Sequence, residues 1–252
     1  MCNQMAKTAA MLVIGDEILS GRTPDTNSNY VARQLTAIGI DLKEVRVVGD
    51  VEDEIVAALN ALRARFDFVF TTGGIGPTHD DITADAVAKA FDVGIDYHPE
   101  AYALLEARYA PGEFNEARKR MARIPQGGTL IRNSASVAPG FQIGNVFVMA
   151  GVPMVMRAMM EEILPRLPRG APVLSITIST ALPEGAIAQG LADIQKAYPD
   201  TVIGSYPWYR DGKFGAQLVV RSRDAALVEA AAREIEALAV KLGATPERIS
   251  SA

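Results

Sequence analysis

The residues best suited to chemistry lie in one short stretch, Thr71 to Thr83, where a glycine-rich run precedes two adjacent aspartates. Gly73, Gly74 and Gly76 would let backbone N–H groups approach an anion closely, because glycine carries no side chain to block it. The N-terminus of a following helix would add a positive dipole end. Asp80 and Asp81 would repel a phosphate unless a divalent cation such as Mg²⁺ bridged them to it. The stretch therefore predicts a phosphate site with a metal ion.

A simpler alternative is a tight turn in which Asp81 or Thr83 only caps the next helix. The paired aspartates and the Thr71-Thr72 lead-in favour the anion site over this alternative. The stretch has neither the G-x-x-x-x-G-K-[ST] pattern nor the G-x-G-x-x-G pattern. A P-loop NTPase or an NAD-dependent Rossmann enzyme is therefore not expected.

Three apolar runs that predict buried strands each end at a polar turn: residues 10–14, 45–48 and 68–70. Segments with apolar residues at helical spacing follow them, so strands and helices alternate. Such alternation predicts parallel strands joined by right-handed crossovers, whose carboxyl ends share one rim where ligands bind. We therefore expect three groups to meet at this rim: the Gly15-Asp16-Glu17 turn, Asp50, and the glycine-rich stretch.

These acidic residues also have simpler interpretations. Asp50 could cap the helix that begins near Asp53. Asp16 and Glu17 could belong to a solvated turn. Which of them meet depends on the strand order, and the sequence leaves that order open.

The chain beyond the first helices adds a basic run and a hairpin. A predicted helix from Glu113 to about Ala122 carries Arg118, Lys119 and Arg120, with Arg123 just after it. We interpret this run as a solvated face rather than a phosphate site. Short strands then form a hairpin around Gly144-Asn145, and Gly151-Val152-Pro153 opens another helix.

A Pro- and Gly-rich linker at residues 168–172 predicts two domains, 9–168 and 172–243. The first is expected to be α/β, a three-layer α/β/α domain with a mostly parallel sheet. The second reads as a β-α-β-β-α unit, a small α+β subdomain. Its segment from Gly204 to Tyr209 is interpreted as a turn that could lay aromatic rings over a base, or as a packed hairpin tip.

The composition limits the classes of function. A net charge of −5 and a pI near 5.2 argue against nonspecific binding of nucleic acid. Cys2 is the only cysteine, which argues against a disulfide framework and fits a reducing cytoplasm. No apolar run approaches the roughly 20 residues of a membrane span, so no membrane partner is expected.

Several motifs in the same order resemble the molybdopterin-binding domain family, and most closely its CinA (competence/damage-inducible protein A) branch. They are Gly15-Asp16-Glu17-Ile18-Leu19-x-Gly21, Asn27, Thr71 to Thr78, Asp80-Asp81-x-Thr83, Ala138-Pro139-Gly140-Phe141 and Gly151-Val152-Pro153. The resemblance covers about residues 9–166. The chain departs from CinA from Ser175 on. There, the segment Ile203 to Pro207 is similar to the molybdopterin-binding-like domain of FAD synthetases. Ile75 departs from the pattern, because molybdopterin adenylyltransferases usually have Thr there.

The resemblance implies a metal-dependent hydrolase that cleaves the pyrophosphate of a nucleotide such as ADP-ribose or FAD. The alternatives are a non-catalytic pterin- or nucleotide-binding module, with molybdopterin as the ligand, and a molybdenum-cofactor biosynthesis protein that transfers an adenylyl group. The cofactor would be Mg²⁺, Mn²⁺ or Co²⁺, and a homo-oligomer, dimer or trimer, is implied. Asp50 and Asp81 would be catalytic, and Asp50, Asp80 and Asp81 would hold the metal. The expected ligand-binding residues are Gly15, Asp16, Glu17, Asn27, Thr72, Gly73, Gly74, Gly76, Pro77, Thr78, Gly151 and Pro153.

Overall fold

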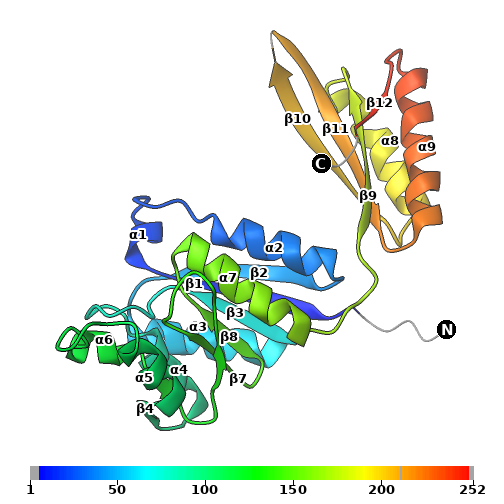
Figure 1. Ribbon diagram of the computed structural model, residues 1–252. Helices are drawn as coiled ribbons and strands as arrows, with labels where there is room; N and C mark the ends of the chain where they lie inside the picture. The colour runs from blue at the N-terminus through cyan, green and yellow to red at the C-terminus, as the bar shows by residue number, and fades with distance from the viewer. Residues whose placement is uncertain (1–5, 211, 250–252) are drawn as a thin grey trace. The chain divides into compact units, whose positions relative to one another are not determined.

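The computed structural model describes residues 6–210 and 212–249 of the 252-residue chain, so Cys2 lies outside the described part. The chain divides into two compact units, residues 1–170 and 171–252 (Figure 1). The division falls inside the Pro- and Gly-rich segment at residues 168–172. Throughout the described residues, every helix is too short or too polar to cross a bilayer.

A six-stranded, mostly parallel sheet organises the first unit, as the strand and helix alternation predicts. Its order is β2-β1-β3-β8-β7-β6. The parallel strands are β1 (Thr8–Ile14), β2 (Asp41–Val48), β3 (Phe68–Thr72) and β8 (Val146–Met149). The hairpin strand β7 (Gly140–Ile143) runs antiparallel to β8 and to the edge strand β6 (Thr129–Ile131). The carboxyl ends of β2, β1 and β3 therefore lie side by side.

Helices cover both faces of this sheet (Figure 1). On one face lie α2 (Asn27–Ala37) and α7 (Pro153–Ile163), which continues into the 3-10 turn η1 (Leu164–Arg166). On the other lie α3 (Glu52–Arg65), α4 (Thr83–Phe91) and α5 (Pro99–Glu106). Alternate residues of β1 enter the two cores, Leu12 with α3 and α4 and Met11 with α2 and α7. This burial on both faces explains why β1 is an unbroken apolar run, and it confirms the three-layer fold.

Between α4 and β6 the chain forms a strand pair that was not predicted, around two helices, of which the sequence predicted the one that contains Arg118 to Arg120. The strands β4 (Ile95–Tyr97) and β5 (Arg123–Pro125) pair antiparallel and enclose α5 and the short helix α6 (Glu116–Arg120). Helix α6 ends two residues earlier than expected. Strand β5 escapes sequence analysis because it is only three residues long and ends in proline, which is unfavourable inside strands. Its pairing brings Arg123 back beside α4.

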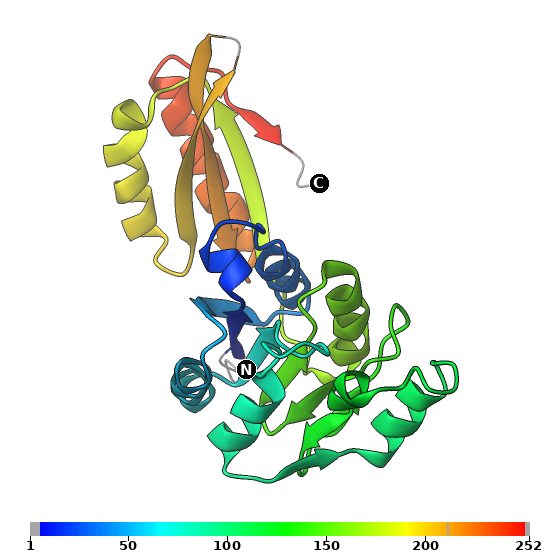
Figure 2. The same ribbon diagram turned by 90° about the vertical axis from the view of Figure 1, so that its left-hand side faces the viewer.

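The second unit is an antiparallel sheet with two helices on one face (Figure 2). The strand order is β10 (Val202–Arg210), β11 (Lys213–Ser222), β9 (Leu174–Thr180) and β12 (Glu247–Ile249). The helices α8 (Glu184–Ala197) and α9 (Ala225–Lys241) bury Ile187 and Ile235 against Ile178 and Leu218 of the sheet. This confirms the α+β subdomain.

The segment from Gly204 to Tyr209 in the second unit corrects the sequence analysis. Residues Gly204 to Tyr209 are not a turn, because β10 continues to Arg210 and pairs with β11 along its whole length. Trp208 lies over Gly215, where a Cβ atom would come 2.5 Å from the indole Cζ2.

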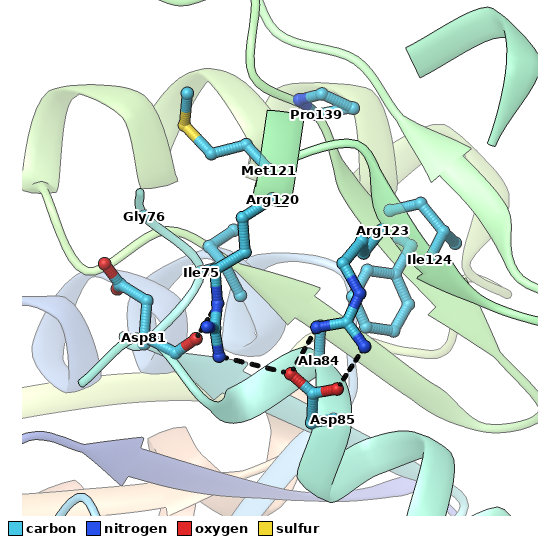
Figure 3. A pocket seen from close by; sticks show the side chains of 12 residues that line it. Ile75, Gly76, Asp81, Ala84, Asp85, Arg120, Met121, Arg123, Ile124 and Pro139 are labelled. Atoms are coloured by element: carbon cyan, nitrogen blue, oxygen red, sulfur yellow. Dashed lines mark hydrogen bonds and ion pairs between the residues drawn. The ribbon is translucent and has the colours of Figure 1, made fainter. Parts of the chain in front are cut away.

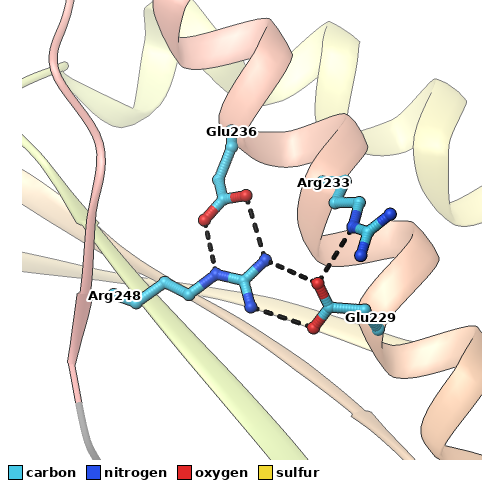
Figure 4. A network of polar contacts seen from close by, with 4 residues as sticks. All are labelled: Glu229, Arg233, Glu236 and Arg248. Atoms are coloured by element: carbon cyan, nitrogen blue, oxygen red, sulfur yellow. Dashed lines mark hydrogen bonds and ion pairs between the residues drawn. The ribbon is translucent and has the colours of Figure 1, made fainter.

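The strand β12 lies beyond the predicted end of the subdomain at residue 243. Ion pairs from Arg248 to Glu229 (2.9 Å) and Glu236 (2.6 Å) tie it to α9 (Figure 4).

Candidate functional site

The glycine-rich loop joins β3 to α4 and is fastened at both ends. The Gly73 N–H donates to the Met149 carbonyl (3.2 Å), and the Thr83 hydroxyl donates to the Gly73 carbonyl (2.9 Å). The Thr83 N–H donates to the Gly74 carbonyl (3.0 Å). A Cβ on Gly73 would lie 2.0 Å from the Ile14 carbonyl oxygen, so only glycine fits there. The loop therefore has a fixed shape before any ligand arrives.

Three amides of this loop are available to an anion. Among the described residues, the N–H groups of Gly74, Ile75 and Gly76 have no hydrogen-bond acceptor. The first turn of α4 also lacks a side-chain cap, so its positive dipole end adds to these donors. The structure corrects one expectation: the Gly73 amide is engaged by Met149, so Gly73 shapes the loop rather than offering a donor.

Thr78 holds the carboxylate of Asp81. Asp81 Oδ2 accepts hydrogen bonds from the Thr78 N–H (2.8 Å) and hydroxyl (2.6 Å). A Cβ on Gly76 would lie 2.6 Å from the same oxygen, so glycine is needed for this close approach. The neighbouring Pro77 is exposed. Asp81 is thus held against the glycine-rich loop by its own turn.

Asp50 lies at the end of β2 in an acidic corner. Its Oδ2 accepts the Asp16 N–H (3.0 Å), at the start of the short helix α1 (Asp16–Leu19). Burial raises the pKa of the Asp50 carboxyl, and the charges of Asp16, Glu17 and Asp80 raise it further. The structure therefore brings together acids from the ends of three adjacent strands, as predicted. This concentration of negative charge attracts cations.

The predicted metal ligands are only partly gathered. Among the described residues, no group of three or more His, Cys, Asp or Glu side chains is arranged to hold a metal ion. The charge of Asp80 raises the pKa of Asp50, whereas the Asp81 carboxylate accepts a hydrogen bond from Thr78. The three aspartates do not form a complete protein cage. Mg²⁺ commonly uses one or two carboxylates together with substrate phosphates, and a metal at Asp50 and Asp80 remains a prediction of that kind.

A second polar hollow, which we call the Asn27 pocket, lies at the ends of β1 and β3. Asn27 Nδ2 donates to the Gly151 carbonyl (2.8 Å), while Asn27 Oδ1 and the Thr72 hydroxyl are buried without a partner among the described residues. Buried polar atoms normally have partners, so these two indicate a bound water or ligand. The pocket is lined by Val13, Glu17, Ile18, Thr23, Pro24, Asp25, Thr26, Asn27, Thr72, Gly151 and Pro153.

The Asn27 pocket and the glycine-rich loop adjoin each other. A Cβ on Gly151 would lie 3.2 Å from the Gly73 Cα, so the two glycines pack closely. On the other side, the Glu17 carboxylate folds over Gly15, where its Oε2 would lie 2.3 Å from an added Cβ. The turns that carry Gly15, Gly73 and Gly151 therefore lie at the ends of β1, β3 and β8, whereas ligand binding by these residues stays a prediction.

A third hollow, which we call the arginine pocket, was missed (Figure 3). Arg123 makes a two-pronged ion pair with Asp85 (2.7 and 3.0 Å), and Arg120 also reaches Asp85 (3.3 Å). Both side chains are about 30% exposed, rather than forming a solvated face. The i, i+3 spacing of the two arginines was the available signal. The pocket is lined by Gly74, Ile75, Gly76, Asp81, Ala84, Asp85, Arg120, Met121, Arg123, Ile124, Pro139 and Phe141.

Fold and rim together define the class of protein: a mostly parallel α/β domain, covered on both faces, with a glycine-rich loop at the strand ends. The chain belongs to the probable molybdopterin binding domain family, whose model matches residues 10–169. Residues 172–244 match the middle domain of FAD synthase. Both matches confirm the resemblance seen in the sequence.

Individual relatives agree with this assignment. A protein of Sulfurisphaera tokodaii is 32% identical over 259 residues, covering 94% of this chain and 97% of its own. A protein of Archaeoglobus fulgidus is 34% identical over 229 residues, covering 90% of this chain and 96% of its own. The crystal structure of CinA from Thermoplasma acidophilum, a protein of unknown function, superposes with a TM-score of 0.61 at 33% identity. It covers 64% of this chain and 98% of the CinA chain.

Proposed function

We propose that this protein hydrolyses the diphosphate bond of a nucleotide such as ADP-ribose or FAD with the help of a divalent cation. One observation carries the proposal. Three loop amides without an acceptor among the described residues, at Gly74, Ile75 and Gly76, lie at the same rim as the acidic corner around Asp50. Amides stabilise the charge that develops on phosphoryl oxygens, and a cation attracted by the acids neutralises the diphosphate.

The reaction adds one water across one phosphorus–oxygen bond. The water oxygen attacks one phosphorus atom and loses its proton to solvent. The bond between that phosphorus and the bridging oxygen breaks, so the second phosphate leaves with the bridging oxygen. ADP-ribose thereby gives AMP and ribose 5-phosphate, and FAD gives AMP and FMN. Asp50 and Asp80 would hold Mg²⁺, Mn²⁺ or Co²⁺, which lowers the pKa of a bound water and polarises the diphosphate.

Each residue of the rim has a separate task in this proposal. The amides of Gly74, Ile75 and Gly76 bind the phosphoryl oxygens, and Asp81 orders the loop through its hydrogen bonds to Thr78. The Asn27 pocket supplies an acceptor oxygen and a hydroxyl to the uncharged part of the substrate. Because residues 172–244 match the middle domain of FAD synthase, a flavin nucleotide is among the substrates to test.

The deciding experiment is an AMP-release assay on ADP-ribose, FAD and NADH with Mg²⁺, Mn²⁺ and Co²⁺. Asp50→Asn and Asp81→Asn should each lower kcat/KM by about 100-fold or more, a loss usual for residues that position charge in a transition state. Asp53→Asn is the matched control, because Asp53 pairs with Lys89 on the surface of α3. Wild-type turnover in folded Asp81→Asn would remove Asp81 from the mechanism. No AMP from any substrate with any metal would refute hydrolysis.

A binding function without hydrolysis is the alternative favoured by the Asn27 pocket. The oxygens of Asn27 and Thr72, which have no partner in the described part of the chain, suit a heterocycle with N–H donors, such as a pterin. The family model is that of a probable molybdopterin binding domain. Calorimetric titration with molybdopterin or a nucleotide, without AMP release, would support this function. ATP-dependent modification of molybdopterin would instead support a role in cofactor assembly.

A homo-oligomer, dimer or trimer, remains a prediction from the family resemblance. Light scattering at micromolar concentration will give the mass of the species in solution.

A further inference from the structure

The arginine pocket lies beside the glycine-rich loop, towards β7 and away from the acidic corner. We propose that Arg120, supported by Arg123, binds a phosphoryl group of the ligand there together with the amides of Gly74 and Gly76. This inference deepens the proposed function. It rests on that function only in taking the phosphoryl group to be part of a substrate. It assigns the two phosphates of a diphosphate to opposite sides of the loop.

The hydrogen bonds of Arg120 fix its guanidinium without exhausting its donors. Nε donates to the Asp81 carbonyl (3.3 Å), and Nη2 donates to Asp85 Oδ2 (3.3 Å). Within the described part of the chain, Nη1 has no acceptor, so it keeps two N–H groups for a ligand. In Figure 3 the side chain reaches down from α6 between Asp81 and Asp85, next to Ile75 and Gly76 of the loop.

Asp85 positions the two arginines together. Its carboxylate accepts two hydrogen bonds from Arg123 (2.7 and 3.0 Å) and one from Arg120. Two positive charges thus share the one negative charge of Asp85. The other acid in the pocket, Asp81, directs its carboxylate to Thr78. A group of fixed guanidiniums with spare donors is the arrangement that recognises phosphate oxygens.

The surroundings favour a single phosphoryl group over a larger ligand part. Met121, Ile124 and Phe141 contribute apolar side chains to the lining of the same pocket. The loop amides provide donors from one side and Arg120 from the other. A tetrahedral anion can accept from both sides at once, whereas a flat heterocycle belongs in the Asn27 pocket with its unpaired oxygens.

A purely structural ion-pair cluster predicts different behaviour, and Asp85 separates the two cases. Asp85→Asn removes the shared negative charge, keeps one acceptor oxygen and retains both arginines in the chain. If the arginines bind phosphate, this variant should bind pyrophosphate at least as tightly as the wild type, although it is less stable. If the cluster only joins α4 to β5, the variant should lose stability and show no pyrophosphate binding that depends on Arg120.

The test is calorimetric titration with pyrophosphate in the presence of EDTA, so that neither metal nor turnover contributes. Arg120→Met should weaken binding about tenfold, equivalent to about 1.4 kcal/mol. Arg118→Met is the matched control on the same helix, because Arg118 bonds to Glu113 and stacks on Tyr109 outside the pocket; it should leave the affinity unchanged. If Arg120→Met does not fold, Arg120→Lys is the second variant. It keeps the positive charge but loses the planar guanidinium with its paired donors, and should weaken binding about threefold.

Folded Arg120→Met or Arg120→Lys that binds pyrophosphate as tightly as the wild type would overturn the proposal. So would a wild-type protein that does not bind pyrophosphate. Because the titration involves no hydrolysis, a failure to release AMP leaves this inference standing. Conversely, an active hydrolase whose pyrophosphate affinity ignores Arg120 refutes this inference alone.

Discussion

Replacing Thr83 by valine should uncouple the glycine-rich loop from α4. Thr83 is fully buried, and its hydroxyl donates to the Gly73 carbonyl at 2.9 Å. Valine has nearly the same shape, so the substitution removes the hydrogen bond and little else. A buried carbonyl left without its donor costs about 1–3 kcal/mol. We therefore expect Thr83→Val to lower the free energy of unfolding of the first unit by about 2 kcal/mol.

Thr71→Val is the control, because it should change the free energy of unfolding in the opposite direction. Thr71 is also fully buried, but its hydroxyl has no partner among the described residues. Valine there removes an unpaired polar group, which should stabilise the protein by about 1 kcal/mol. The two variants should differ by about 3 kcal/mol, or about 1.5 M in urea midpoint at an m-value of about 2 kcal/mol/M.

The assay must report on the first unit. Trp208 is the only tryptophan and belongs to the second unit, so its fluorescence serves as an internal reference that neither variant should shift. Amide exchange of α4 then follows the unit that contains Thr83, and far-UV circular dichroism follows the helices of both units. Thr83→Ser keeps the hydroxyl and loses one methyl group, at about 1 kcal/mol, so it should retain pyrophosphate affinity while Thr83→Val loses it. Equal midpoint shifts in the same direction for Thr83→Val and Thr71→Val would refute the reasoning.

Three further predictions concern charged groups. Asp50→Asn should raise the melting temperature of the metal-free protein at pH 8, because the pKa of Asp50 is raised by burial and its ionised form therefore costs stability. The gain should disappear as the pH falls through the raised pKa towards 4, and a gain independent of pH would contradict it. The pKa of Asp67 is lowered to about 2 by Lys7 and the backbone of Thr8, so Asp67→Asn should cost about 1 kcal/mol at pH 7, after allowance for partial exposure. Most of this cost should be lost by pH 2, because the folded protein then takes up a proton at Asp67. Urea titrations at both pH values check this, and an equal loss at pH 2 would count against it. Arg248→Met should speed amide exchange in β12, less so in 1 M salt because exposed ion pairs are screened; unchanged protection would show that strand pairing alone holds β12.

Much of the fold was predictable because its signals are local. The apolar run of β1 reflects burial on both faces, and the helices after it show apolar residues at helical spacing. The glycine-rich stretch follows an apolar run directly, and this order predicted its position at the end of β3. Motifs of this kind depend on the conformation of a few neighbouring residues, so the sequence alone carries them.

The sequence analysis failed where short segments depend on distant partners. Strand β5 has three residues and exists because it pairs with β4, and β12 exists because it pairs with β9. Gly204 and Pro207 are typical of a turn, yet pairing with β11 keeps the segment from Gly204 to Tyr209 extended. In each case the pairing energy of the sheet outweighs the local preference.

The sequence by itself determined the alternating architecture, the glycine-rich loop and the presence of acids after three successive strands. Only the tertiary structure decided which atoms remain free. The Gly73 amide is taken by Met149, Asn27 reaches Gly151 across 124 residues of chain, and Arg120 and Arg123 turn inward to Asp85. The physical reason is that backbone geometry and periodicity are encoded by neighbours in the chain, whereas hydrogen-bond partners and burial are set by strand order and packing between distant segments.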